Sequence, residues 1–191
     1  EVSDLEGISA AGISPQARRL TPALDANVLI SVLIEGESLP LSPRGLTSPV
    51  VLTRAALSLI HNQKLIVDCG SFHRPRVEHI KLGQGPALSP ASGAALSQET
   101  VEELFDEGVK FAQKLCNEEL VVVGECVPGG TSTALAVLLA LGYPAHNLMS
   151  GSLPNLNHHI EIDLAQCGIK AAAKLSKKSE AEQKQHFLAS P

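Results

Sequence analysis

Short, continuous apolar runs that end in small polar residues recur along the chain and predict β-strands. The first run, 64–70 (KLIVDCG), is rich in branched residues. A second run covers 119–125 (ELVVVGE), and a shorter third run covers 146–152 (HNLMSGS). Apolar runs of this length without alternation are typical of strands that are buried on both faces of a parallel sheet.

Two stretches with helical periodicity lie between these runs, one after the first run and one after the second. Residues 97–116 begin with Ser97 as a candidate cap, and their apolar residues fall on one stripe, which predicts a helix. Residues 131–142 are almost purely aliphatic and end at Gly142, which predicts a helix with a glycine stop. The order strand, helix, strand predicts a right-handed βαβ unit.

The N-terminal third is less regular. Residues 1–22 carry Gly, Ser and Pro with little periodicity, and we expect a helix that starts near Asp25. After a proline-rich loop, Ser48 and Pro49 are suited to the cap and first position of a helix over 49–62.

Composition narrows the fold class. The chain has 191 residues, of which 44% are hydrophobic, with four Phe, one Tyr and no Trp. A core of Ala, Leu, Val and Ile suits helices packed on a parallel sheet. We therefore expect one α/β domain over 1–191, with a three-layer α/β/α, Rossmann-like and mostly parallel sheet.

The net charge and the length of the apolar stretches argue against nucleic acid and membranes as partners. The formal net charge is −5, and Lys and Arg are scattered apart from 174–178, so no basic face for nucleic acid is expected. No apolar stretch reaches the roughly 20 residues that cross a bilayer, and no signal-like start is present. We expect a cytoplasmic protein with neither a nucleic-acid nor a membrane partner.

The cysteines and histidines do not form a recognisable metal pattern. The four cysteines lie far apart and without C-x-x-C spacing, so neither a disulfide framework nor a zinc site is indicated. The histidines lack ligand spacing, and surface positions suit them better. The sequence therefore predicts no metal and no resident cofactor.

Polar residues follow each predicted strand. Asp68 ends the first, and Ser150, Ser152 and Asn155 follow the third. In an open parallel sheet the carboxyl ends of the strands meet at one edge, where ligands bind. Either these side chains line a pocket, or Asp68 caps local amides and the others only form a turn.

The most informative segment is 124–133 (GECVPGGTST), at the end of the second predicted strand. Gly129 and Gly130 allow a close backbone turn, and Thr131, Ser132 and Thr133 offer hydroxyls to an anion at the positive end of the following helix. The segment lacks the lysine of a triphosphate loop and the G-x-G-x-x-G of a dinucleotide site, so a monophosphate suits it best. The alternative is a tight turn with a hydroxyl cap.

Two residues beside this loop, Glu125 and Cys126, are candidates for roles in catalysis. The carboxylate of Glu125 would repel a phosphate unless it faced another part of the ligand. Sugar hydroxyls are suitable partners for this carboxylate, so Glu125 is the candidate catalytic residue. Cys126 beside it allows a thiol nucleophile below a helix N-terminus, although most cysteines in aliphatic settings are inert.

The segments 124–143, 150–155, 17–29 and 48–57 together resemble the archaeal and cyanobacterial branch of the nicotinate-nucleotide:dimethylbenzimidazole phosphoribosyltransferase family. This resemblance implies a Rossmann-like, usually dimeric enzyme. Such an enzyme moves phosphoribose from nicotinate mononucleotide to a benzimidazole or purine base in cobalamin biosynthesis. It also implies that the diglycine and hydroxyl loop holds the phosphate and that Glu125 lies at the substrate.

The resemblance covers about 15–155, with Ser132 standing where the family has threonine, and it fades over 157–191. Family members continue for well over a hundred further residues, which include the glutamate regarded as their general base. We therefore expect the chain to be the N-terminal part of a longer enzyme. The alternative is a noncatalytic module or inactive fragment that keeps the phosphate loop.

Overall fold

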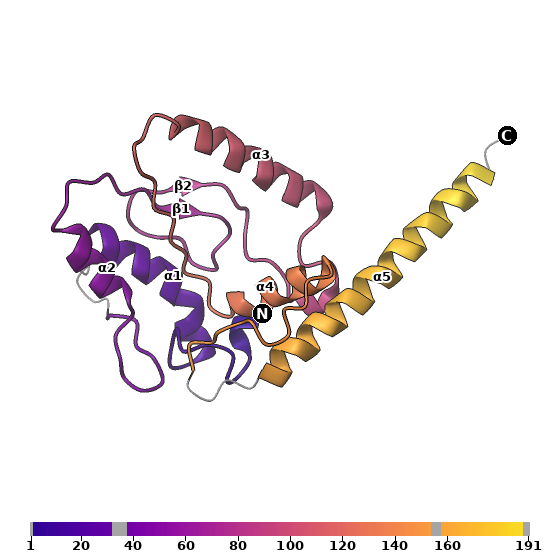
Figure 1. Ribbon diagram of the computed structural model, residues 1–191, viewed down its shortest axis with the longest axis horizontal. Helices are drawn as coiled ribbons and strands as arrows, with labels where there is room; N and C mark the ends of the chain where they lie inside the picture. The colour runs from indigo at the N-terminus through magenta and orange to yellow at the C-terminus, as the bar shows by residue number, and fades with distance from the viewer. Residues whose placement is uncertain (1, 32–37, 154–157, 189–191) are drawn as a thin grey trace.

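The computed structural model describes residues 2–31, 38–153 and 158–188, and it combines helices with a small parallel sheet (Figure 1). The elements in chain order are η1 (Val2–Asp4), α1 (Pro15–Ile30), α2 (Val50–Leu57), β1 (Val67–Asp68), β2 (Ile80–Lys81), η2 (Pro90–Ser92), α3 (Gln98–Lys114), α4 (Gly130–Ala140) and α5 (His158–Leu188).

Helix α1 begins ten residues before the position expected from the sequence, so the prediction of a start near Asp25 is wrong. The Ser14 side chain accepts a hydrogen bond from the amide of Ala17 at 3.1 Å, and Pro15 takes the first helical position. This cap outweighs Pro22, which lies inside the helix without an amide to donate.

Helix α2 is shorter than the predicted 49–62. It begins at Val50 after Pro49, whose side chain provides no cap, and ends at Leu57. The side-chain amide of Asn62 donates to the carbonyls of Leu57 and Ile60 at 2.7 and 2.8 Å. These bonds satisfy carbonyls at the end of the helix and fold the chain back there.

The sheet of the described residues consists of β1 and β2, which are parallel and pair Val67 with Ile80 and Asp68 with Lys81. Strand β1 lies within the predicted run 64–70. The predicted strands at 119–125 and 146–152 do not form in the described part of the chain. The protein is thus a mixed helical and parallel-strand structure compatible with α/β, without the expected three layers.

Helices α3 and α4 confirm the two strongest helical predictions. Ser97 caps α3 by accepting from the amide of Thr100 at 3.1 Å. After α4, Gly142 adopts a φ of 86°, and the amide of Tyr143 bonds to the carbonyl of Leu138 at 3.0 Å, which ends the helix.

The core of the structure lies between α4, α5 and η2. Leu135, Ala145 and Ala165 are buried together. Gly168 of α5 lies against the carbonyl of Pro90, where a side chain would clash. Small residues thus let α5 cross close to η2, and its C-terminal part extends away from the body (Figure 1).

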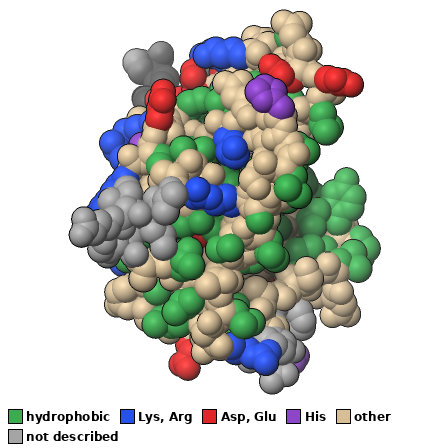
Figure 2. Space-filling model, turned by 90° about the vertical axis from the view of Figure 1, so that its left-hand side faces the viewer, with side chains coloured by type: hydrophobic (Ala, Val, Ile, Leu, Met, Phe, Trp, Pro, Cys, Tyr) green, Lys and Arg blue, Asp and Glu red, His purple; other side chains and the backbone are tan. Residues whose placement is uncertain are grey.

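Many apolar side chains remain exposed elsewhere. Figure 2 faces the α2 side of the molecule and shows hydrophobic side chains spread among polar atoms. Leu52 of α2 and the following Leu59 and Ile60 are among the exposed residues.

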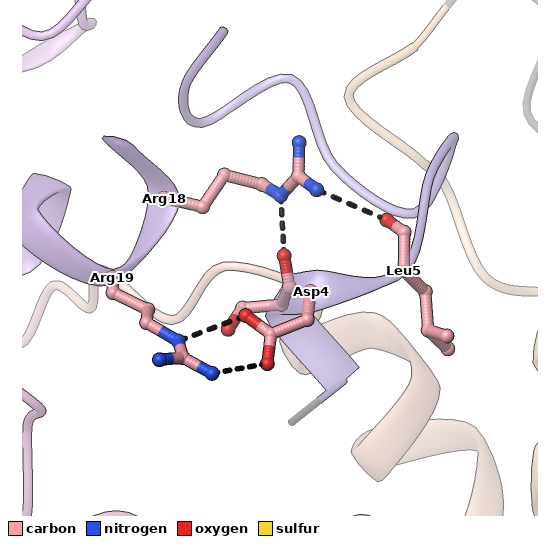
Figure 3. Close-up of polar contacts among 5 residues, drawn as sticks. Asp4, Leu5, Arg18 and Arg19 are labelled. Atoms are coloured by element: carbon pink, nitrogen blue, oxygen red, sulfur yellow. Dashed lines mark hydrogen bonds and ion pairs between the residues drawn. The ribbon is translucent and has the colours of Figure 1, made fainter. Parts of the chain in front are cut away.

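Two arginines attach the N-terminal segment to α1 (Figure 3). Arg18 is buried and donates to the carbonyls of Ser3 and Leu5. Arg19 makes a two-pronged ion pair with Asp4, with distances of 2.9 and 2.5 Å. The Arg19 guanidinium also lies 4.6 Å from the centre of the Phe72 ring.

No helix in the described ranges is both long and apolar enough to span a bilayer.

Candidate functional site

The diglycine bend forms as the sequence predicts and leads directly into α4. Gly129 has a φ of 79° and takes the N-cap position, where no side chain caps the helix. The amide of Gly130 donates to the carbonyl of Val127 at 2.8 Å. A β-carbon on Gly129 would lie 2.9 Å from the Cγ1 of Val2, so both backbone angle and space require glycine.

A buried carboxylate lies at this helix end. Glu161, in the first turn of α5, is fully buried, and its Oε1 accepts a hydrogen bond from the Thr131 hydroxyl at 2.7 Å. The positive end of the α4 dipole favours an anionic group there. Because the resemblance fades after 157, nothing in the sequence pattern identified Glu161.

The three hydroxyls of the loop have different surroundings. Thr131 is half-buried and bonded to Glu161, whereas Thr133 is exposed. Ser132 is fully buried on the helix face that also buries Leu135, and its Oγ has no hydrogen-bond partner among the described residues. The structure therefore does not present the three as one exposed set of donors.

The N-terminal segment links the bend to the region that follows α4. Val2 and Ile8 approach Gly129, and the amide of Ala10 donates to the Ser152 hydroxyl at 2.8 Å. Two of the predicted polar loops therefore contact the same short segment. Its attachment to α1 by Arg18 and Arg19 fixes its position (Figure 3).

The remaining predicted residues lie at the surface or outside the described ranges. Glu125 is exposed on the extended segment before the bend, and Ser150 is also exposed. Asn155 lies outside the described residues. The proposed roles of these three residues stay predictions.

Asp68 has the contacts of a turn-forming residue. Its Oδ1 accepts from the amides of Gly70 and Ser71, at 3.0 and 2.8 Å, and from the Ser71 hydroxyl at 2.9 Å. Burial raises the pKa of Asp68, but these hydrogen bonds and the charge of His79 outweigh it, so the pKa is lowered overall. These contacts match the alternative in which Asp68 caps local amides.

The structure adds a polar cluster that the sequence did not indicate. Asp25 of α1 accepts through Oδ2 from the Ser48 hydroxyl at 2.9 Å and from the Cys126 thiol at 3.3 Å. Its Oδ1 is buried without a partner in the described part of the chain. The three residues are far apart in sequence, which is why no spacing pattern could reveal them.

This cluster argues against a thiolate at Cys126. Burial, followed by the charge of Asp25, raises the pKa of the Cys126 thiol far above its usual value. The thiol is a hydrogen-bond donor in this setting, and the interpretation of Cys126 as an activated nucleophile is wrong.

A shallow hollow of about 200 Å³ lies against α1. It is lined by Leu20, Ala23, Leu24, Asn27, His73, Arg74 and Arg76. No residue of 124–133 belongs to it. No group of three or more possible metal-binding side chains occurs within 2–31, 38–153 and 158–188.

The bend, the uncapped α4 and the polar segment at 150–152 together define a candidate anion-binding site in a protein of mixed helices and parallel strands. Comparison with known proteins shows which proteins the chain is similar to. The chain is 40% identical over 157 residues to a UPF0284 protein of Saccharolobus islandicus (strain L.S.2.15). It is 42% identical over 161 residues to a UPF0284 protein of Gloeobacter violaceus, and 39% identical over 157 residues to one of Saccharolobus solfataricus.

These matches make the chain a homologue of UPF0284 proteins over 81 to 83% of its length. The chain spans 45% of the Saccharolobus proteins and 42% of the Gloeobacter protein, which is less than half of each. The names of these relatives state no activity. No protein-family model matches the chain.

Proposed function

We propose that the chain is the phosphate-binding part of a phosphoribosyltransferase that uses nicotinate mononucleotide. The acceptor is a purine or benzimidazole base of the kind that forms the lower ligand of a cobamide. The similarity of the 124–143 segment to that enzyme family supports this assignment.

The observation that carries the proposal is the N-terminus of α4, which has no side-chain cap and lies against the Glu161 carboxyl group. The amides of Gly130 and Ser132 already donate to backbone carbonyls, so the phosphate would use the other amides of this turn. Gly129 provides no side-chain cap, and the Thr131 hydroxyl donates to the buried carboxylate of Glu161. Backbone amides at a helix N-terminus, together with the helix dipole, are suited to bind phosphate. In the proposed complex the phosphate takes the place of Glu161 as acceptor for Thr131.

The chemistry of the transfer assigns roles to the other residues. Loss of nicotinate from the nucleotide leaves positive charge at the anomeric carbon, so catalysis consists mainly of positioning and charge stabilisation. In this proposal Glu125 accepts from the ribose hydroxyls or stabilises that charge. The exposed Thr133 hydroxyl completes the phosphate contacts in this proposal, and Gly130 lets the phosphate approach the backbone. The buried Ser132 hydroxyl would reach the phosphate only after the start of α4 rearranges.

Polar groups from the other loops line the proposed site. In this proposal Ser150 and Ser152 face the nucleotide, and Asp68 orders the neighbouring loop through its bonds to Gly70 and Ser71. Asn155 lies outside the described residues, and its contact with the nucleotide stays a prediction. The complete enzyme acts in the cytoplasm as a homodimer in this proposal.

Glu161 makes the proposal sharply testable, since the Thr131 hydroxyl has one proton and cannot donate it to Glu161 and a phosphate together. Whenever the Glu161 side chain is ionised, it also repels a phosphate. Two negative charges about 4 Å apart repel by several kcal/mol at the effective dielectric of a protein surface. Removing the charge of Glu161 is therefore expected to strengthen nucleotide binding.

The test is calorimetric titration of nicotinate mononucleotide into the wild-type chain, Glu161→Gln and the control Asp163→Asn. Asp163 is an exposed acid two positions along the same helix. We expect Glu161→Gln to lower Kd by about tenfold or more, and Asp163→Asn to leave it nearly unchanged. Absence of binding by both the folded wild type and Glu161→Gln would contradict the proposal.

The second candidate is a noncatalytic nucleotide-binding module, which is favoured by the exposed position of Glu125 on the extended segment before the bend. A nicotinate-release assay with adenine or dimethylbenzimidazole as acceptor separates the two. Binding with release supports the transferase, and binding without release supports the module. A turnover unchanged by Glu125→Gln would exclude Glu125 from the reaction.

A further inference from the structure

Residues 120–123 (LVVV) form a strongly exposed apolar segment within the described ranges. Leu120, Val122 and Val123 are 80%, 83% and 88% exposed. Within the described ranges no residue pairs with this segment in a β-ladder. Branched residues in a continuous apolar run are suited to a central strand and poorly suited to water.

The two helices that flank this segment, α3 and α4, also expose apolar side chains. Helix α3 carries Val101, Phe105 and Val109 at four-residue spacing, and all three are exposed, Phe105 by 70%. None of the residues of α3 is buried. Helix α4 likewise exposes Val137, and Leu141, four residues later and just past the end of the helix, is also exposed. Residues four apart lie on one helix face, so each helix leaves an apolar stripe uncovered.

Helix, extended segment and helix therefore form a unit that lacks the sheet against which it would pack. A lone strand leaves its amides and carbonyls unpaired at both edges. An amphipathic helix gains most of its stability by burying its apolar face. Both requirements are met when neighbouring strands pair with 120–123 and the helices cover the resulting sheet.

We propose that this surface, formed by 120–123 and the α3 stripe, is a docking site for one particular polypeptide. The occupant is the polypeptide homologous to the part of the UPF0284 relatives that the chain does not match. More than half of each relative lies in that part. A polypeptide of that length is long enough to bring a strand to each edge of 120–123, whereas the same segment of a second copy would pair at one edge only. The proposal rests on the homology and the exposure, and not on the assigned phosphoribosyl transfer.

The experiment co-expresses the full chain with the unmatched portion of the Saccharolobus islandicus relative and measures amide hydrogen exchange by mass spectrometry. We expect a one-to-one complex in which the amides of 120–123 exchange at least about a hundredfold more slowly than in the chain alone. Val122→Lys places a charge within the new sheet and is expected to abolish both the complex and the protection.

Leu59→Lys is the matched control, because Leu59 is 84% exposed and lies outside the proposed surface. It is expected to form the complex normally. Unchanged exchange of 120–123 despite a helical circular-dichroism spectrum of the chain would overturn the proposal. Protection that appears in the chain alone and rises with its concentration would also overturn it, in favour of self-association.

Discussion

At the scale of single residues, the buried carboxylate of Asp68 and the half-buried carboxylate of Asp25 differ in what surrounds them. Asp68 lies at the end of β1 and accepts three hydrogen bonds through one oxygen. Asp25 lies in the middle of α1, accepts bonds from Ser48 and Cys126, and keeps one oxygen buried without a partner in the described chain. Their pKa values are therefore shifted in opposite directions.

The Asp25→Asn variant tests whether burying the charged carboxylate of Asp25 lowers the stability of the fold. Burial raises the pKa of Asp25, and the bonds from Ser48 and Cys126 offset this only in part. A raised folded-state pKa means that the stability contributed at low pH is lost as pH rises through that pKa. Compared with the Asp25→Asn variant, the wild-type chain should therefore lose free energy of unfolding between about pH 4 and pH 7. Thermal unfolding across this range measures it, and parallel curves for the two proteins would contradict it.

Asp68→Asn should behave in the opposite sense. The pKa of Asp68 is lowered overall, so its stabilising effect is present above the pKa of the unfolded chain and is lost as pH falls. We expect a loss of about 1–3 kcal/mol at pH 7 that shrinks below about pH 4. Urea unfolding at several pH values checks this, with Asp163→Asn as the exposed control. A constant difference at all pH values would show that the charge is not responsible.

At the scale of elements, local signals account for α3 and α4 but not for the strands predicted at 119–125 and 146–152. Ser97 and the apolar stripe that follows it specify α3, and the aliphatic run closed by Gly142 specifies α4. A helix forms its own hydrogen bonds, so a cap and a period suffice to place it. The run at 119–125 carries an equally clear strand pattern, but a strand needs a neighbour that the described residues do not provide.

The bend that starts α4 gives a prediction at this scale. Gly129→Ala is expected to destabilise the chain by about 1–3 kcal/mol, because φ is positive there and the new methyl would contact Val2. Gly108→Ala, within α3 and in open space, is the control and should stabilise by about 0.5–1 kcal/mol. Chemical denaturation measures both. A neutral Gly129→Ala would mean that the bend adopts another conformation in solution.

At the scale of the whole molecule, burial is concentrated in two places. One is the α4, α5 and η2 core around Leu135, and the other is the N-terminal segment held on α1 by Arg18 and Arg19. Helix α3, none of whose residues is buried, lies away from both and runs along the top of the view, above the two-stranded sheet (Figure 1). This distribution fits a chain that matches less than half the length of its relatives.

The sequence by itself determined the features that depend on neighbouring residues: the caps and periods of α3 and α4, the glycine bend at 129–130 and the turn at Asp68. Each of these is fixed by hydrogen bonds or backbone angles within a few positions. Only the tertiary structure decided that Asp25 meets Cys126, that Glu161 meets Thr131 and that 120–123 stays unpaired. These outcomes depend on which distant segments pack together, and that is set by burial over the whole chain rather than by any local pattern.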